Sequence, residues 1–360
     1  MEKYNTTKVL NKGQYSKVKL AEDINTGEEY AIKTIRVPDD DSEYEDGMQV
    51  VDLVGDDYDS DDEQDDDDES SDEENAGQST GLVVLVEENT SKSNYMEHIR
   101  TKSEGSEQTV TEEASDPKLN HLMTLINKLK KQQTESLSER IQHEVMALNK
   151  IKNIDHPDSQ YLIGVKEVIE DSIKQKIYIV FEYAKGGDLL SFIENQNKLS
   201  EDVAKRYFVQ IVRGLSLLHN SGICHRDLKP ENILLYENTI KITDFGFCGM
   251  FKKNNPMFNS LCGTENYVAP EVLEQEAEYD GIKSDVWSLG CILFTMASGL
   301  FAFDDESHPK LIKSIIDVDY KMPNHFSPLL KDLLSSVLVK DPNQRLSLDD
   351  ILTHGWVVKE

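Results

Sequence analysis

The sequence predicts an α+β fold of two lobes, and three observations carry the prediction. Strand-like segments dominate residues 1–37 and 161–183, whereas apolar residues at helical spacing dominate the chain after Gly187. A long acidic segment separates the two strand-rich stretches. A β-rich front and a helical remainder are typical of a small antiparallel β lobe with one helix beside a larger helical lobe.

The small lobe is predicted from segments that alternate apolar and polar residues between turn signals. Asn25-Thr26-Gly27 is such a signal, and Gly13 separates the first two segments. The strand-like segments are Tyr4–Lys12, Tyr15–Asp23, Glu28–Val37 and Ile177–Phe181. Leu137–Ile151 is amphipathic at helical spacing and supplies the one helix. We assign residues 1–37 and 135–184 to this lobe.

The acidic segment is predicted to be disordered. Residues 37–80 contain 21 Asp and Glu and no Lys or Arg, and Asp56–Glu74 is nearly all Asp, Glu and Ser. Such a run buries no apolar surface, and its charges repel one another. Residues 82–86 form a short apolar island, and residues 118–133 show helical spacing. We place a mostly disordered acidic insert at 38–134, with a helical exit at 118–133.

The large lobe is assigned to residues 185–360. Asp202–Asn220 and Ser284–Ser298 both carry apolar stripes at helical spacing. Removing 38–134 leaves 263 residues, which suffice for a two-layer enzyme core.

Composition disfavours several classes of protein. The 360 residues include 68 acidic and 38 basic side chains, a formal net charge of −30, and such a surface repels nucleic acid. The sequence contains no run of 18 apolar residues, the length that would suggest a membrane span, and its first residues lack a signal-peptide pattern. Four widely spaced cysteines indicate reduced thiols, neither a disulfide framework nor a zinc knuckle. We therefore expect an intracellular protein, in the cytoplasm or the nucleus.

Four short motifs occur in a fixed order. They are Asn11-Lys12-Gly13-Gln14-Tyr15-Ser16-Lys17-Val18, Ala31-Ile32-Lys33, His225-Arg226-Asp227-Leu228-Lys229-Pro230-Glu231-Asn232, and Asp244-Phe245-Gly246 followed by Ala269-Pro270-Glu271. This set resembles the eukaryotic protein kinase family over residues 1–37 and 135–360. The resemblance implies the bilobal protein kinase fold, ATP and Mg²⁺ as cofactors, and transfer of the ATP γ-phosphate to Ser or Thr hydroxyls of protein substrates.

Phosphoryl transfer depends on positioning and on neutralising charge more than on covalent chemistry. A cation must fix the α- and β-phosphates, and Lys33, on an apolar strand with Ala31 and Ile32, is the candidate. By the resemblance, Glu144 is the partner that orients this lysine, although the two are 111 residues apart. The alternative is two ordinary surface charges, since exposed ion pairs contribute only about 0–1 kcal/mol.

The catalytic loop and the motif at Asp244 supply oxygen ligands for Mg²⁺. Asp244 follows the strand-like Thr239–Thr243, and Asn232 lies 5 residues after Asp227. A sparse set of oxygens suits this metal. By the resemblance, Asp227 accepts or orients the proton of the substrate hydroxyl, and Lys229 neutralises the phosphate in transfer. The joint spacing, with Asp244 17 residues after Asp227, argues against isolated turn or cap residues.

The nucleotide-binding residues are assigned by the same resemblance. The family's three glycines appear as Asn11, Gly13 and Ser16, and because Asn tolerates left-handed backbone angles we expect nucleotide binding to survive in weakened form. Glu182 and Ala184 mark the hinge that would bind adenine through backbone groups. The residues expected to contact ATP are Leu10, Asn11, Lys12, Gly13, Gln14, Tyr15, Ser16, Val18, Ala31, Lys33, Glu182, Ala184, Asp188, Leu234 and Asp244.

Further motifs refine the resemblance. Lys229 and Gly263-Thr264 favour serine/threonine over tyrosine specificity. Ser260–Tyr267 resembles the activation segments of the calmodulin-dependent and cyclic-nucleotide-dependent kinase groups, and Asp285–Gly290 and Asp341–Trp356 are most similar to the calcium/calmodulin-dependent group. Glu360 lies four residues past Trp356, so we expect no calmodulin-binding tail.

Two ionic contacts are expected in the large lobe. Arg345 should pair with Glu271. Arg226, just before the catalytic aspartate, needs an anion, and a phosphate placed on Ser260 by an upstream kinase would supply it. The alternative is that Ser260 is a silent loop serine.

The substrates are expected to carry basic residues before the target Ser or Thr. Glu231 and Asp188 lie where basophilic relatives hold substrate arginines, and the alternative is that both carboxylates are merely solvated.

Three hypotheses fit the acidic insert, which enters between Lys33 and Glu144. In the first hypothesis the insert is an inert expansion, which the fold tolerates because loop closure costs little per added residue. Alternatively, it recruits a basic partner protein or biases the helix of Glu144. We favour the inert and recruiting hypotheses over the regulatory one.

Two rival functions are weighed against the kinase. A non-catalytic scaffold of this type would lack Lys33, Asp227 or Asp244, and all three are present. An acidic interaction protein would act through the insert instead. No pattern in the sequence assigns an oligomeric state.

Overall fold

The computed structural model describes residues 1, 3–12, 16–37, 137–252, 255–274 and 278–359. The chain divides into two units, one made of Met1–Pro38 with Val86–Glu360 and the other of Asp39–Leu85. The predicted apolar island at 82–86, the helix at 118–133 and the disorder assigned to 38–134 lie outside the described residues.

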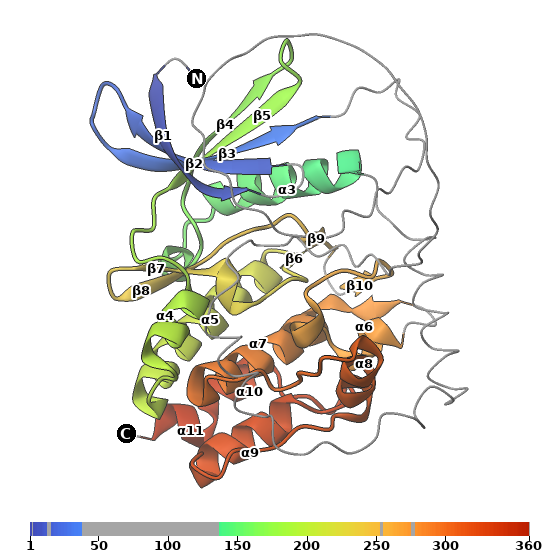
Figure 1. The fold of residues 1–360 in the computed structure, drawn as a ribbon. Coiled ribbons are helices and arrows are strands. Elements are labelled where there is room, and N and C mark those ends of the chain that lie inside the picture. The colour runs from blue at the N-terminus through green and yellow to red at the C-terminus, as the bar shows by residue number, and fades with distance from the viewer. Residues whose placement is uncertain (2, 13–15, 38–136, 253–254, 275–277, 360) are drawn as a thin grey trace, which may run out of the picture. The chain divides into compact units, whose positions relative to one another are not determined.

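A five-stranded antiparallel sheet forms the small lobe, in the spatial order β1-β2-β3-β5-β4 (Figure 1). Its strands are β1 (Tyr4–Lys12), β2 (Ser16–Asp23), β3 (Glu29–Arg36), β4 (Val165–Asp171) and β5 (Lys176–Glu182). The turn between β2 and β3 holds Gly27 at φ +71°, a backbone angle that glycine adopts without strain. The four predicted strands are confirmed with ends that differ by a single residue.

Alternation along the strands gives this sheet two faces. On the inner face, Ile35 and Ile179 join the main core together with Leu148 of helix α3 (Leu137–Lys152), which confirms the predicted helix. On the outer face lies a separate small cluster made of Tyr4, Ala21, Tyr30, Ile32, Tyr178 and Val180. Side chains of one parity therefore approach α3, and those of the other parity lie on the opposite face.

The large lobe is helical. Its helices are α4 (Leu189–Gln196), α5 (Glu201–Asn220), α6 (Pro270–Leu273), α7 (Gly281–Ser298), α8 (His308–Asp317), α9 (Pro328–Val337), α10 (Leu348–Thr353) and α11 (Gly355–Val358). α5 begins after Ser200, whose hydroxyl accepts a hydrogen bond from the amide of Val203. α7, buried along nearly its whole length, packs against α5 at the centre of the lobe. The predicted helices at Asp202–Asn220 and Ser284–Ser298 are confirmed.

Short paired strands and 3₁₀ turns carry the loops that follow α5. The pairs are β6 (Ile223–Cys224) with β9 (Gly249–Met250), β7 (Ile233–Tyr236) with β8 (Thr239–Ile242), and β10 (Met257–Phe258) with β11 (Tyr279–Asp280). The 3₁₀ turns in these loops are η3 (Pro230–Asn232) and η4 (Glu265–Tyr267), and a further one, η2 (Pro157–Tyr161), lies between α3 and β4. Cys224 and Cys291 are buried free thiols. Within the described ranges, every helix is too short or too polar to cross a bilayer.

Candidate active site

Lys33 and Glu144 meet between the sheet and helix α3. Lys33 lies on β3 opposite Val18 of β2 and Ile179 of β5, so its side chain projects from the inner face. Its Nζ lies 2.8 Å from Oε1 of Glu144, and the two side chains are only 12% and 6% exposed. The contact expected across 111 residues is present, and its burial distinguishes it from a surface ion pair.

Asp244 joins this pair from the loop after β8. Its Oδ1 lies 3.2 Å from Nζ of Lys33 and accepts a hydrogen bond from the amide of Gly246 at 3.4 Å. The backbone at Asp244 has φ +61°, a strained angle for a residue with a side chain. Burial alone would raise the pKa of this carboxyl, but the charges of Lys33 and Lys229 prevail and lower the pKa to about 2. Asp244 is therefore an anion at neutral pH.

Asp227 is the centre of a second cluster. Its Oδ1 accepts hydrogen bonds from the amide and the hydroxyl of Thr264, each at 2.9 Å. Nζ of Lys229 lies 3.1 Å from Oδ2 of Asp227 and donates to the Thr264 hydroxyl at 2.8 Å. The amide nitrogen of Asn232 donates to the carbonyl of Asp227 at 2.8 Å. A carboxylate, an ammonium group and a hydroxyl thus share one small space.

Asp285, at the start of α7, holds the catalytic loop in shape. Its fully buried carboxylate accepts hydrogen bonds from the amides of His225 and Arg226, both at 2.8 Å. The second of these amides belongs to a residue with φ +64°, so the carboxylate supports a strained turn just before Asp227. Burial would raise the pKa of Asp285, but its contact with His219 outweighs burial and lowers it. No local sequence pattern indicates this role, because the groups involved are about 60 residues apart.

Comparison with known proteins identifies the family of this chain. A family model described as protein kinase domain matches residues 83–357, which is more than half of the chain. The chain belongs to the protein kinase domain family. The match begins after β3, and the buried contact between Lys33 and Glu144 links the preceding strands to the matched part of the kinase domain.

Curated plant kinases are similar to this kinase domain over 226 residues. The chain is 41% identical to CBL-interacting protein kinase 11 of Oryza sativa subsp. japonica, over 62% of this chain and 43% of that protein. It is 40% identical to CBL-interacting serine/threonine-protein kinase 15 of Arabidopsis thaliana, over 62% of this chain and 51% of that protein. The chain therefore spans about half the length of the curated relatives it matches.

The residues expected around adenine are distributed over both lobes of the kinase domain. Val18, Ala31 and Phe181 lie on the same inner face of the sheet as Lys33. Leu234 of β7 forms an isolated bridge with Asp188, at the start of the large lobe. These positions are compatible with adenine binding between the two lobes, and the expected adenine contacts stay a prediction.

The glycine-rich loop is described only at its two ends. Leu10, Asn11 and Lys12 are exposed at the end of β1, and Ser16 opens β2. The expected contacts at Gly13, Gln14 and Tyr15 lie outside the described residues. The side chain of Asn11 accepts a hydrogen bond from the amide of Lys12 at 2.7 Å, so its amide group stabilises the strand end.

The side chains of Glu182 and Asp188 are engaged in structural contacts. Glu182 accepts from the amide of Gly164 at 2.6 Å and pairs with Lys241 at 2.8 Å, so the hinge prediction concerns its backbone only. Asp188 caps α4, because its two oxygens accept from the amide and the hydroxyl of Ser191, each at 2.8 Å. Contact of Asp188 with ribose or substrate, which the sequence suggested, would have to share these bonds.

Arg140 is a contact residue of the site that sequence reasoning missed. It lies one turn before Glu144 on α3, and its Nε donates to the carbonyl of Gly246 at 3.4 Å. Its guanidinium stacks over the ring of Phe247, 4.2 Å from the centroid. These contacts tie the helix that carries Glu144 to the segment after Asp244. The spacing of four residues from Glu144 was the available signal.

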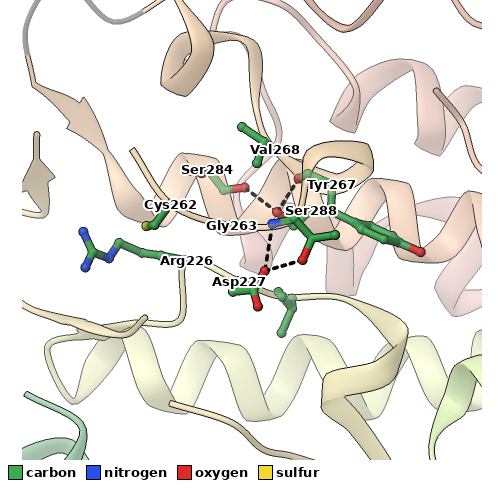
Figure 2. A pocket seen from close by; sticks show the side chains of 10 residues that line it. Arg226, Asp227, Cys262, Gly263, Tyr267, Val268, Ser284 and Ser288 are labelled. Carbon is green, nitrogen blue, oxygen red and sulfur yellow. Dashed lines mark hydrogen bonds between the residues drawn. The ribbon is translucent and has the colours of Figure 1, made fainter. Parts of the chain in front are cut away.

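A small hollow lies beside the catalytic loop, between Gly263 and α7 (Figure 2). Its lining residues are Arg226, Asp227, Leu228, Cys262, Gly263, Thr264, Tyr267, Val268, Ser284 and Ser288. Gly263 has φ +105°, and a Cβ there would lie 2.9 Å from the carbonyl oxygen of Arg226. Only glycine therefore lets the chain pass close enough for Thr264 to reach Asp227.

Arg226 makes the contact expected with Ser260. Its Nη1 donates to the Ser260 hydroxyl at 2.6 Å, and its Nε donates to the carbonyl of Phe247 at 2.8 Å. The guanidinium also lies over the ring of Phe258, 4.6 Å from the centroid. Ser260 thus lies beside a cation, and its phosphorylation stays a prediction.

Proposed function

We propose that this protein is a serine/threonine protein kinase that transfers the γ-phosphate of ATP to hydroxyls of protein substrates. One observation carries the proposal: the buried contacts of Lys33 with Glu144 and Asp244 stand beside the Asp227 cluster, whose Lys229 acts electrostatically on Asp244. The family match supports it, as does a relative whose name contains serine/threonine-protein kinase.

The residues of the site suit magnesium and ATP. Asp244 is an anion, and Asn232 offers an amide oxygen because its nitrogen is engaged with Asp227. Oxygen ligands are those that Mg²⁺ prefers. Asp244 and Asn232 would hold the metal, and Lys33 would bind the phosphates. Bound magnesium–ATP supplies the phosphoryl group and neutralises part of its charge.

Asp227 would orient the substrate hydroxyl and take its proton. Its Oδ1 already accepts a hydroxyl hydrogen bond from Thr264, so the carboxylate can hold a Ser or Thr hydroxyl in the same way. Burial would lower the pKa of Lys229, but Asp227 and Glu231 prevail and raise it. Lys229 therefore stays an ammonium group that stabilises negative charge during transfer.

The test is an assay of the full chain with ATP, Mg²⁺ and a degenerate peptide library that contains Ser, Thr and Tyr acceptors. We expect labelling of Ser and Thr peptides and its loss in Lys33→Met, because that variant lacks the phosphate-binding cation. Equal labelling by Lys33→Met, or labelling of tyrosine alone, would contradict the proposal. Partner binding that survives in Lys33→Met would be assigned to the acidic insert.

The preference for basic substrates is part of the same proposal, and three buried polar atoms support it. Glu231 Oε2, Glu194 Oε1 and the Tyr267 hydroxyl have no hydrogen-bond partner among the described residues. Burial and then the charge of Glu231 raise the pKa of Tyr267, and Glu194 acts in the same direction, so these groups lie near one another. Unpartnered buried carboxylates are costly, and a guanidinium or ammonium group of a substrate would offset that cost.

Glu231→Gln is expected to reduce the preference for Arg over Ala before the target residue about 10- to 100-fold in kcat/KM, since hydrogen bonds to charged groups contribute about 1.5–3 kcal/mol. Paired peptides assayed with both proteins measure this, with Asp202→Asn on the exposed first turn of α5 as control.

The preference should also depend on pH. Burial raises the pKa of Glu231, and an acid below its pKa is neutral, so the wild-type preference should grow as the pH rises through that raised pKa and stay flat in Glu231→Gln. Equal preference in both proteins would contradict the assignment.

Phosphorylation of Ser260 is proposed to activate the kinase. A phosphate there would accept charge-assisted hydrogen bonds from Arg226, which already contacts the hydroxyl. We expect phosphoserine at position 260, introduced by nonsense suppression, to raise kcat/KM about 5- to 150-fold, the range of couplings of about 1–3 kcal/mol. Ser260→Ala should stay at the basal rate, and Ser172→Ala in the exposed β4–β5 turn serves as control. Equal activity of the phosphorylated and unphosphorylated proteins would assign Ser260 to a silent loop.

A further inference from the structure

Five cationic side chains lie on the outer face of the small-lobe sheet. In the register of β2 with β3, Lys17 pairs with Thr34 and Lys19 with Ile32, and these positions alternate with Val18 and Lys33 of the inner face. Residues opposite one another in an antiparallel ladder share a face. The outer face therefore carries a set that we call the basic face: Lys12, Lys17, Lys19, Arg36 and Lys176. It spans the four neighbouring strands β1, β2, β3 and β5 of Figure 1, on the side away from α3.

The basic face contains like charges in direct opposition. Lys12 lies opposite Lys17, and Arg36 lies opposite Lys176. Such cross-strand pairs destabilise a sheet unless an anion screens them. Because the chain carries a net charge of −30, cations concentrated here are not explained by composition.

The described residues form no ion pair with this basic face. None of its five side chains makes an ion pair or side-chain hydrogen bond with any residue that the structure describes. Two carboxylates of the edge strand β4 lie on the same face, and one of them, Asp171, is directly opposite Lys176. Glu167 binds Lys3 and the Tyr4 hydroxyl, and Asp171 lies 3.8 Å from Nζ of Lys174.

We propose that the basic face docks an extended acidic segment of a partner protein. Alternate side chains of an extended peptide recur at about 6.6–6.8 Å, the same spacing as Lys17 and Lys19 along β2. A short acidic peptide meets only these cations, whereas nucleic acid or an anionic membrane also meets the acidic remainder of the surface. Lys17 and Lys19 are half-buried, opposite Thr34 and Ile32 respectively, so an arriving peptide meets preplaced charges.

The proposed docking surface lies on the side of the sheet away from Lys33, although one of its residues, Lys12, was also expected to contact ATP. Lys33 and Val18 project from the opposite side of the same sheet, so a segment bound to the basic face leaves the nucleotide region free. The inference therefore stands independently of the proposed kinase activity.

The test measures binding of a fluorescein-labelled Asp/Glu dodecapeptide to the full chain by anisotropy, at low and at physiological salt. We expect saturable binding that weakens as salt rises. Lys17→Gln/Lys19→Gln/Lys176→Gln should bind on the order of tenfold more weakly, since each exposed charge pair contributes about 0.2–1 kcal/mol. The control Lys198→Gln/Lys313→Gln/Lys321→Gln changes the same charge on the large lobe and should bind as wild type. Equal melting temperatures of the two triple variants establish that both are folded.

Several outcomes would overturn the proposal. Absence of peptide binding at low salt is one, and equal loss in both triple variants is another. Tighter binding of single-stranded DNA or phosphatidylserine vesicles than of the peptide would assign the face to those ligands. A further test is chemical acetylation of the protein alone at low and at high salt. If Lys17 and Lys19 are modified only at high salt, a segment of the same chain already covers the basic face, and the proposed partner segment is excluded.

Discussion

Asp227→Asn lowers kcat about 10²- to 10⁴-fold, the usual contribution of a positioned general base, and changes the KM for ATP little. The substitution keeps the shape of the side chain and an oxygen for the amide of Thr264, which now lies 2.9 Å from Oδ1. It removes the negative charge that faces Lys229 at 3.1 Å and replaces a proton acceptor with an amide. The loss should therefore fall on the chemical step.

Single-turnover kinetics on a Ser peptide measure this change, and the fluorescence of a nucleotide analogue measures binding. Asp202→Asn, which removes one exposed carboxylate from the large lobe, controls for net charge. An Asp227→Asn protein within threefold of wild type would show that the Thr264 contact is structural and that the site lacks its proposed base. Unchanged nucleotide affinity together with lost turnover would distinguish the expected loss of catalysis from misfolding.

The main contacts of this site could be predicted because the motif residues occupy fixed relative positions in the family that they resemble. Lys33 and Glu144, which are 111 residues apart, meet as the resemblance implied, and Asp244 joins them. The strands and helices around them followed from apolar periodicity, which sets the faces that pack. Their catalytic and metal-binding roles remain predictions that the Asp227 and Lys33 variants test.

The parts that could not be predicted depend on contacts between segments without a shared pattern. Asp285 supports the catalytic loop from α7, and Arg140 stacks on Phe247, and in both cases the partner lies far away in the sequence. Asp188 was expected to face ribose or substrate, whereas its oxygens cap α4 through Ser191. A carboxylate immediately before a helical stretch has the same sequence appearance in both roles. The basic face likewise requires the register of four strands, which a single sequence does not fix.

Arg345→Met is expected to destabilise the large lobe by about 3–5 kcal/mol, the cost of leaving a buried charge unpaired. Arg345 pairs with Glu271, as the sequence predicted, with Nη1 2.9 Å from Oε1 and Nη2 3.1 Å from Oε2. Its side chain is fully buried, and it also donates to the carbonyls of Lys283 and Val339. Removal of the guanidinium leaves the carboxylate of Glu271, which is only 14% exposed, without its cationic partner.

Urea unfolding followed by tryptophan fluorescence measures this loss, because both tryptophans of the chain, Trp287 and Trp356, belong to the core of the large lobe. Lys340→Met is the matched control, since its pair with Glu274 spans 2.9 Å but is 50% and 39% exposed and should contribute no more than about 1 kcal/mol. If the two variants lose similar stability, burial does not set the strength of these ion pairs. The ordering of the two losses therefore tests whether Arg345 joins α6 to the segment before α10 as a structural element of the kinase fold.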